Sequence, residues 1–116
     1  LSLGILAIER AKRMLEAEWR PESLIVAEKL KAHAESRGTT LVHWATAWVL
    51  NNSAVTSAIA GPRTLEQWTS YFGALDYKWT AEDEALANSL VTPGHPSTPG
   101  FNDPAYPIEG RFPAVG

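Results

Sequence analysis

A turn in the middle of the chain carries the residues best suited to chemistry. The sequence Ala60-Gly61-Pro62-Arg63-Thr64 follows a short apolar run and leads into a segment with helical signals. Backbone N–H groups, the positive end of a helix dipole and the Arg63 guanidinium would converge there, and this arrangement binds phosphate. The same residues also fit an ordinary strand-to-helix turn with a solvated arginine, which on these residues alone is the commoner case.

The three histidines have no spacing that predicts a metal site. His33, His43 and His95 are never three or four residues apart, as two ligands on one helix face would be. His43 lies beside Trp44 in an apolar stripe, which favours a satisfied core histidine over a ligand or a base. His33 is expected at a partly exposed helix position, and His95 in a loop.

Two further clusters are better explained by structure than by catalysis. Glu82, Asp83 and Glu84 fall in the predicted first turn of a helix, where capping and the helix dipole explain them better than a catalytic carboxylate pair does. Trp44 and Trp48 are four residues apart and are expected in the core rather than on a ligand. The sequence contains no Cys, no Gly-x-Ser-x-Gly elbow and no glycine-rich phosphate loop of standard spacing. It therefore shows no complete catalytic constellation.

These residues must be positioned by a mostly helical chain. Helices are predicted over residues 22–37, after Pro21 and before Gly38; from Thr40 to about Asn51; from Thr64 to about Leu75; and from Thr80 onward. The run Ala54–Ala60 is short, β-branched and small, which predicts a buried strand that ends at Gly61-Pro62. Because one strand cannot make a sheet, its partners would come from residues 1–8, from a second copy or from sequence outside this chain.

Composition bounds the classes of protein to which the chain can belong. Its 116 residues, 45% hydrophobic and 20% charged, suffice for one soluble globular domain. With 13 acidic and 10 basic side chains the net charge is −3, which argues against a duplex nucleic acid as partner. The absence of Cys fits a reducing, cytoplasmic compartment, and no apolar run is long enough to span a membrane. The chain begins with Leu1, as a processed or truncated product or an incomplete longer gene would.

Composition changes near Val91. Six of the eight prolines and four of the eight glycines lie beyond it, which divides the chain into residues 1–91 and an irregular tail, residues 92–116. The tail carries Phe101, Tyr106 and Phe112, and a solvated linker has no use for aromatic side chains of this size. We therefore expect the tail to pack against a surface rather than to be a free linker.

Three ordered stretches resemble a known family. Residues 26–38, 45–50 and 55–67, within a colinear match over about residues 22–92, closely resemble the C-terminal part of aldo-keto reductases. The tail from Pro93 to Arg111 resembles the C-terminal extension of one bacterial branch of that family. An ordered match of this length is more specific than any single motif within it.

The resemblance implies the fold class α/β, and within it a (β/α)8 TIM barrel. A full barrel takes about 250 residues, so the chain would hold the C-terminal third or so. On its own this part would be mostly helical with one or two short strands. Ala54–Ala60 would be the eighth strand of the barrel, and residues 1–6 the remains of the seventh.

The resemblance also implies a binding site for NADP(H). Gly61 and Pro62 would bring the backbone to the phosphates, and Arg63 would hold the 2′-phosphate. Gln67 would face the ribose and adenine, as would the position four residues further on, which is usually Asn in the family. That position is Tyr71 here, a departure that bears on the preference for NADP(H) over NAD(H). With Ser70 as a further hydroxyl, the implied cofactor-binding residues are Gly61, Pro62, Arg63, Gln67, Ser70 and Tyr71.

The family's chemistry rests on four residues that this chain does not contain. They are an Asp, a Tyr acid, a Lys that lowers the pKa of the Tyr, and a His, so we expect no catalysis by the chain alone. The first hypothesis is the cofactor-binding portion of an NADPH-dependent reductase of aldehydes or ketones. The alternative is a non-enzymatic remnant or interaction domain that buries its open barrel edge against a partner or a second copy. An isolated nucleotide-binding module is a third, weaker hypothesis.

Overall fold

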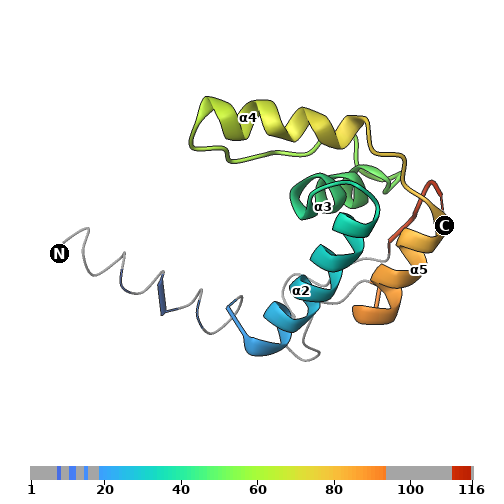
Figure 1. The fold of residues 1–116 in the computed structure, drawn as a ribbon, viewed down its shortest axis with the longest axis horizontal. Helices are drawn as coiled ribbons and strands as arrows, with labels where there is room; N and C mark the ends of the chain where they lie inside the picture. The colour runs from blue at the N-terminus through green and yellow to red at the C-terminus, as the bar shows by residue number, and fades with distance from the viewer. Residues whose placement is uncertain (1–7, 9–10, 13–14, 16–18, 94–110, 116) are drawn as a thin grey trace.

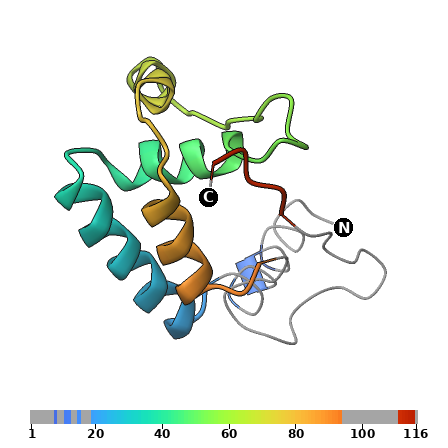
Figure 2. The same cartoon turned by 90° about the vertical axis from the view of Figure 1, so that its right-hand side faces the viewer.

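The computed structural model describes residues 8, 11, 12, 15, 19–93 and 111–115. Within residues 19–93 it contains α2 (Pro21–Ser36), α3 (Leu41–Leu50), α4 (Leu65–Tyr71), the 3-10 helix η1 (Phe72–Leu75) and α5 (Ala81–Leu90). Helix α3 runs across the group, with α2 and α5 on one side of it and α4 on the other (Figures 1 and 2). The four helices predicted from the sequence are confirmed. Among the described residues, no helix has the length and apolar character needed to cross a bilayer.

Short-range capping contacts fix where the helices begin and end. Thr40, Thr64 and Thr80 each accept a hydrogen bond from the backbone N–H three residues further on. Thr80 and Asp83 form a reciprocal capping box. After α2, Gly38 has a φ of 72°, a left-handed conformation that glycine adopts without strain. These signals are local, which is why the sequence located them.

A small core lies where α2, α3 and α5 meet. Ala34, Trp44 and Ala87 are buried there, one from each helix, and Trp79 packs against them. The Trp44 side chain is only 2% exposed, whereas Trp48 on the same helix is 37% exposed. The prediction that both tryptophans lie in the core is therefore confirmed for Trp44 alone.

The prediction of a strand over Ala54–Ala60 is wrong for this structure. These residues have no regular secondary structure, and Ile59 is fully exposed. The described part of the chain contains no β-strand, and its isolated bridge joins Asn52 to Pro113. A strand exists only where a neighbour completes its backbone hydrogen bonds, and these residues find none in the described part. The second expected strand, residues 1–6, lies outside the described residues.

Residues 111–115 lie beside the C-terminal end of α3 (Figure 2) and contact α5 through a side chain. The Arg111 guanidinium binds Glu84 of α5 through Nε to Oε1 at 2.6 Å and Nη2 to Oε2 at 2.9 Å. It also lies 4.2 Å from the centre of the Trp48 ring. Backbone hydrogen bonds between residues 51–53 and 112–114 extend the contact. Residues 111–115 therefore connect α5 to the C-terminal end of α3.

This contact bears on the prediction that the tail packs through its aromatic residues. Packing is confirmed for residues 111–115, but Phe112 is 59% exposed, and the buried anchor is Arg111. A guanidinium can satisfy a buried carboxylate and cover an aromatic ring at once, whereas a phenyl ring can do only the second. Phe101 and Tyr106 lie outside the described residues.

Candidate functional site

The turn predicted to bind phosphate lies directly before α4. The Arg63 N–H donates to Gln67 Oε1 at 2.7 Å, and the Gln67 N–H donates to Thr64 Oγ1 at 3.2 Å. The Gln67 side chain thus closes the turn. Its side-chain carbonyl oxygen and the backbone N–H of Arg63 are therefore already hydrogen-bonded to each other. Arg63 is exposed, which leaves its guanidinium as the charged group that the turn presents to solvent.

Gly61 leaves open space beside the turn. A Cβ added to Gly61 would meet nothing within 4 Å, and its φ lies outside the left-handed region. Neither the backbone conformation nor the packing of the described residues therefore requires a glycine here. A bound group can approach the backbone closely at such a position.

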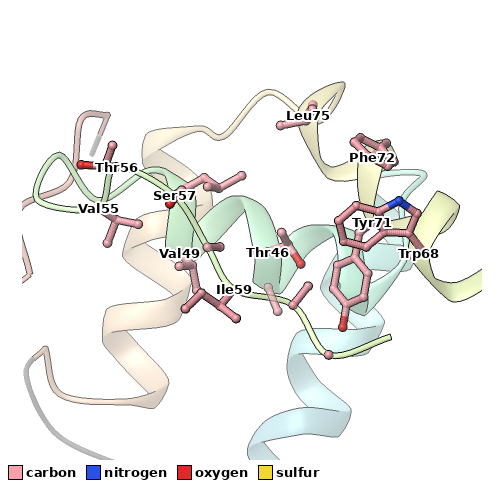
Figure 3. Close-up of a pocket in the computed structure, with 15 residues that line it drawn as sticks. Thr46, Val49, Val55, Thr56, Ser57, Ile59, Trp68, Tyr71, Phe72 and Leu75 are labelled. Atoms are coloured by element: carbon pink, nitrogen blue, oxygen red, sulfur yellow. The ribbon is translucent and has the colours of Figure 1, made fainter. Parts of the chain in front are cut away.

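An apolar groove of about 840 Å³ begins at Gly61 and runs between α3, residues 55–61 and the helices α4 and η1 (Figure 3). Val49 and Ile59 line one side, and Trp68, Tyr71 and Phe72 line the other. A few hydroxyl groups interrupt these apolar walls, from Thr46, Thr56 and Ser57. Apolar walls with a small number of polar groups are typical of sites that hold a ring or an apolar chain.

The structure places the six predicted site residues along the groove, in the turn beside it and on α4. Gly61 and Tyr71 both line the groove, and Arg63 and Gln67 form the turn beside it. Ser70 differs, because its hydroxyl is hydrogen-bonded to His43 Nε2 of α3 at 3.3 Å. Pro62 is half-buried between the groove residues and the turn.

A buried polar cluster around Asp83 was missed by the sequence analysis. The side chain of Asp83 is fully buried. Its Oδ1 accepts from His33 Nε2 at 2.7 Å, Trp44 Nε1 at 3.0 Å and Tyr77 OH at 2.9 Å. Its Oδ2 accepts from the backbone N–H and the hydroxyl of Thr80. The capping role predicted for Asp83 is confirmed, but it involves only one of the two oxygens.

The hydrogen bonds set the charge state of this cluster. Burial alone would raise the pKa of Asp83, but donors from Trp44, His33, Thr80 and Tyr77 outweigh it and hold the pKa well below its ordinary value. Because a carboxylate only accepts, the hydrogen of the His33 contact must reside on Nε2. Burial raises the pKa of Tyr77, so its hydroxyl stays a donor to Asp83. The cluster therefore joins α2, α3 and α5 as a structural unit.

Little in the sequence points to this cluster. His33, Trp44 and Tyr77 lie 50, 39 and 6 residues from Asp83, so their convergence depends on how the helices pack. The expected partial exposure of His33 is observed, at 17% of its side chain. His43 is half-buried rather than a core residue. Within the described residues, no group of three His, Cys, Asp or Glu side chains could hold a metal ion, and His95 lies outside them.

Comparison with known proteins identifies the family. The sequence model of the Aldo/keto reductase family matches residues 5–91, a range that includes α2 to α5 and the turn at Arg63. No curated protein and no solved structure matches the chain. Members of this family are oxidoreductases built on a TIM barrel, and they typically use nicotinamide cofactors. The resemblance is therefore confirmed, and the chain belongs to the aldo/keto reductase family.

Proposed function

We propose that the chain is the C-terminal, cofactor-binding portion of an NADPH-dependent oxidoreductase that reduces aldehydes or ketones. The catalytic tetrad would lie outside this chain, and residues 92–116 would form its C-terminal tail. The observation that carries the proposal is the family match over residues 5–91 together with an exposed arginine in a closed turn beside an apolar groove. A soluble, cytoplasmic enzyme acting on a small carbonyl substrate fits this proposal.

The donor set of the turn fits a nucleotide phosphate. The Arg63 guanidinium is permanently charged and can donate two parallel hydrogen bonds to phosphate oxygens. The open space at Gly61 admits close approach to the backbone, and Tyr71 offers an aromatic face within the groove. The residues proposed to form the NADP(H) site are Gly61, Pro62, Arg63, Gln67, Ser70 and Tyr71. When bound, the cofactor would supply the hydride for carbonyl reduction.

The turn is organised by its own residues before any ligand arrives. The side-chain oxygen of Gln67 accepts from the backbone N–H of Arg63, and the hydroxyl of Thr64 caps α4 by accepting from the backbone N–H of Gln67. Ordering a flexible loop on binding reduces affinity, and a turn that is already closed avoids much of that loss. The amide NH2 of Gln67 is available to a ligand because the Arg63 contact uses only its carbonyl oxygen.

The experiment that tests the proposal is steady-state kinetics of carbonyl reduction by the full gene product. Arg63→Ala is expected to raise KM for NADPH about tenfold or more with kcat nearly unchanged, because a charge-assisted contact to phosphate is lost. Arg37→Ala is the matched control, since Arg37 is also exposed but lies at the end of α2. An unchanged KM for NADPH in Arg63→Ala, or no carbonyl-dependent oxidation of NADPH at all, would contradict the proposal.

A further inference from the structure

Helix α4 carries three of the proposed cofactor-site residues, Gln67, Ser70 and Tyr71, but none of its residues is buried. Leu65 and Trp68 are 79% and 47% exposed. The position of α4 relative to α3 sets where Gln67 and Tyr71 lie beside the groove. Specific contacts between α3 and α4 therefore help to set the geometry of the site.

His43 of α3 makes such a contact with both α4 and η1. Its Nε2 is hydrogen-bonded to Ser70 Oγ at 3.3 Å. A Cβ added to Gly73 of η1 would lie 2.6 Å from Cε1 and 2.9 Å from Nε2 of His43, so the imidazole rests directly on the Gly73 backbone. Real Cβ atoms do not approach other atoms so closely, and a side chain at Gly73 would force the ring away.

The position of His43 is itself fixed by the start of α3. Its backbone N–H donates to the capping hydroxyl of Thr40 at 3.2 Å. The ring therefore extends from a capped helix end, where the backbone is well defined, to one polar and one close-packed contact on the segment 65–75. A side chain with contacts at both Ser70 and Gly73 can fix the spacing of the two helices and the rotation of α4.

We propose that His43 is a positioning residue for the cofactor site, which holds α4 on α3 through Ser70 and Gly73. This inference rests on the proposed function. It gives Ser70 a role different from the one implied by the family resemblance, since its hydroxyl acts through His43 rather than on the cofactor. The site then depends on a residue of α3 that contacts no cofactor.

The test is a set of dissociation constants for NADPH and NADH, measured with the full gene product. His43→Phe keeps a ring against Gly73 but removes the hydrogen bond to Ser70. Ser70→Ala removes the same hydrogen bond from the side of α4. Each is expected to weaken binding about threefold to tenfold, the usual range for one hydrogen bond, and the double variant by the same factor as either alone. The loss is expected to be equal for NADPH and NADH, because α4 moves as a whole. His43→Gln, whose amide nitrogen reaches the place of Nε2, is expected to restore affinity to within about twofold.

Thr69→Ala is the matched control. The Thr69 hydroxyl lies on the same helix but donates to Leu65 O of its own backbone at 2.9 Å, so this variant is expected to bind both nucleotides normally. Thermal unfolding of every variant separates loss of binding from loss of fold. If His43→Phe does not fold, the ratio of NADPH to NADH affinity in Ser70→Ala decides whether the positioning role holds. An equal loss supports the positioning role, and a loss confined to NADPH overturns it.

Two other results would overturn the proposal. The first is a double variant in which the separate effects of His43→Phe and Ser70→Ala multiply, since Ser70 would then contact the cofactor directly. The second is normal binding by His43→Phe. Both results can be told apart from failure of the proposed function, because in that case the unsubstituted protein binds neither NADPH nor NADH.

Discussion

The two sides of α3 differ in how completely the described residues bury their side chains and pair their polar groups. Toward α2 and α5, Trp44 is buried, and both carboxylate oxygens of Asp83 have protein donors. Toward α4, the groove walls remain open, with Phe72 52% and Leu75 68% exposed. We infer that the first side holds the fold together and the second side is the binding surface. Substitutions should therefore separate into those that alter stability and those that alter binding.

The largest effect is expected for Asp83→Ala. Its removal leaves five donor contacts without their acceptor in the core, which should reduce the free energy of unfolding by about 4 kcal/mol. Urea denaturation, monitored by tryptophan fluorescence, measures this change in the free energy of unfolding. Glu82→Ala is the control, because Glu82 is 75% exposed and 3.8 Å from Arg37, and should change stability by about 0.5 kcal/mol or less. Equal effects of the two variants would mean that the cluster does not hold the fold.

A slightly smaller effect is expected for Arg111→Ala. The side chains of Arg111 and Glu84 are 6% and 4% exposed. Removal of Arg111 leaves the Glu84 charge buried, which should reduce the free energy of unfolding by about 3 kcal/mol. Lys31→Ala removes the exposed Lys31–Glu35 pair instead and should cost about 0.5 kcal/mol or less. Denaturation curves that are superimposable for the two variants would show that the chain terminus does not pack in solution.

The pH dependence of stability should report on the same cluster. Because the pKa of Asp83 is lowered on folding, the unfolded chain takes up a proton first as the pH falls. The stabilisation from this group is complete above about pH 5 and should be about 1 kcal/mol smaller at pH 3. Asp83→Asn should lack this component when unfolding is measured across that range. An unchanged pH profile in Asp83→Asn would show that Asp83 is not the group responsible.

The smallest effect is expected on the other side of α3. Ile59 is fully exposed, so Ile59→Ala should change the free energy of unfolding by about 0.5 kcal/mol or less. Urea denaturation under the same conditions gives the comparison. A loss of about 2 kcal/mol would show instead that residues 55–61 are packed in solution, and the contrast between the two sides would disappear.

Sequence reasoning succeeded where the signal was local. Thr40, Thr64 and Thr80 act on backbone groups three residues away, and Gly38 needs only its own backbone conformation. The strand prediction for Ala54–Ala60 failed because composition describes a tendency, whereas a strand needs a partner.

Long-range contacts explain the other differences. The sequence explained Asp83 by capping and the helix dipole, and nothing local suggested a second role for it. Arg111 was overlooked because the aromatic residues of the tail looked like its anchors, and the buried partner Glu84 lies 27 residues away. For the candidate site, the sequence located the turn at Arg63, but the contact of Ser70 with His43 depends on how α4 packs on α3.

The central claim is that the turn at Arg63 recognises the 2′-phosphate of NADPH. Titration of the full gene product with NADPH and with NADH tests it most directly, with Arg63→Ala measured alongside. We expect saturable binding with a preference for NADPH, and loss of that preference in Arg63→Ala while NADH binding is retained. Absence of saturable binding, or a preference for NADPH that survives the substitution, would contradict it.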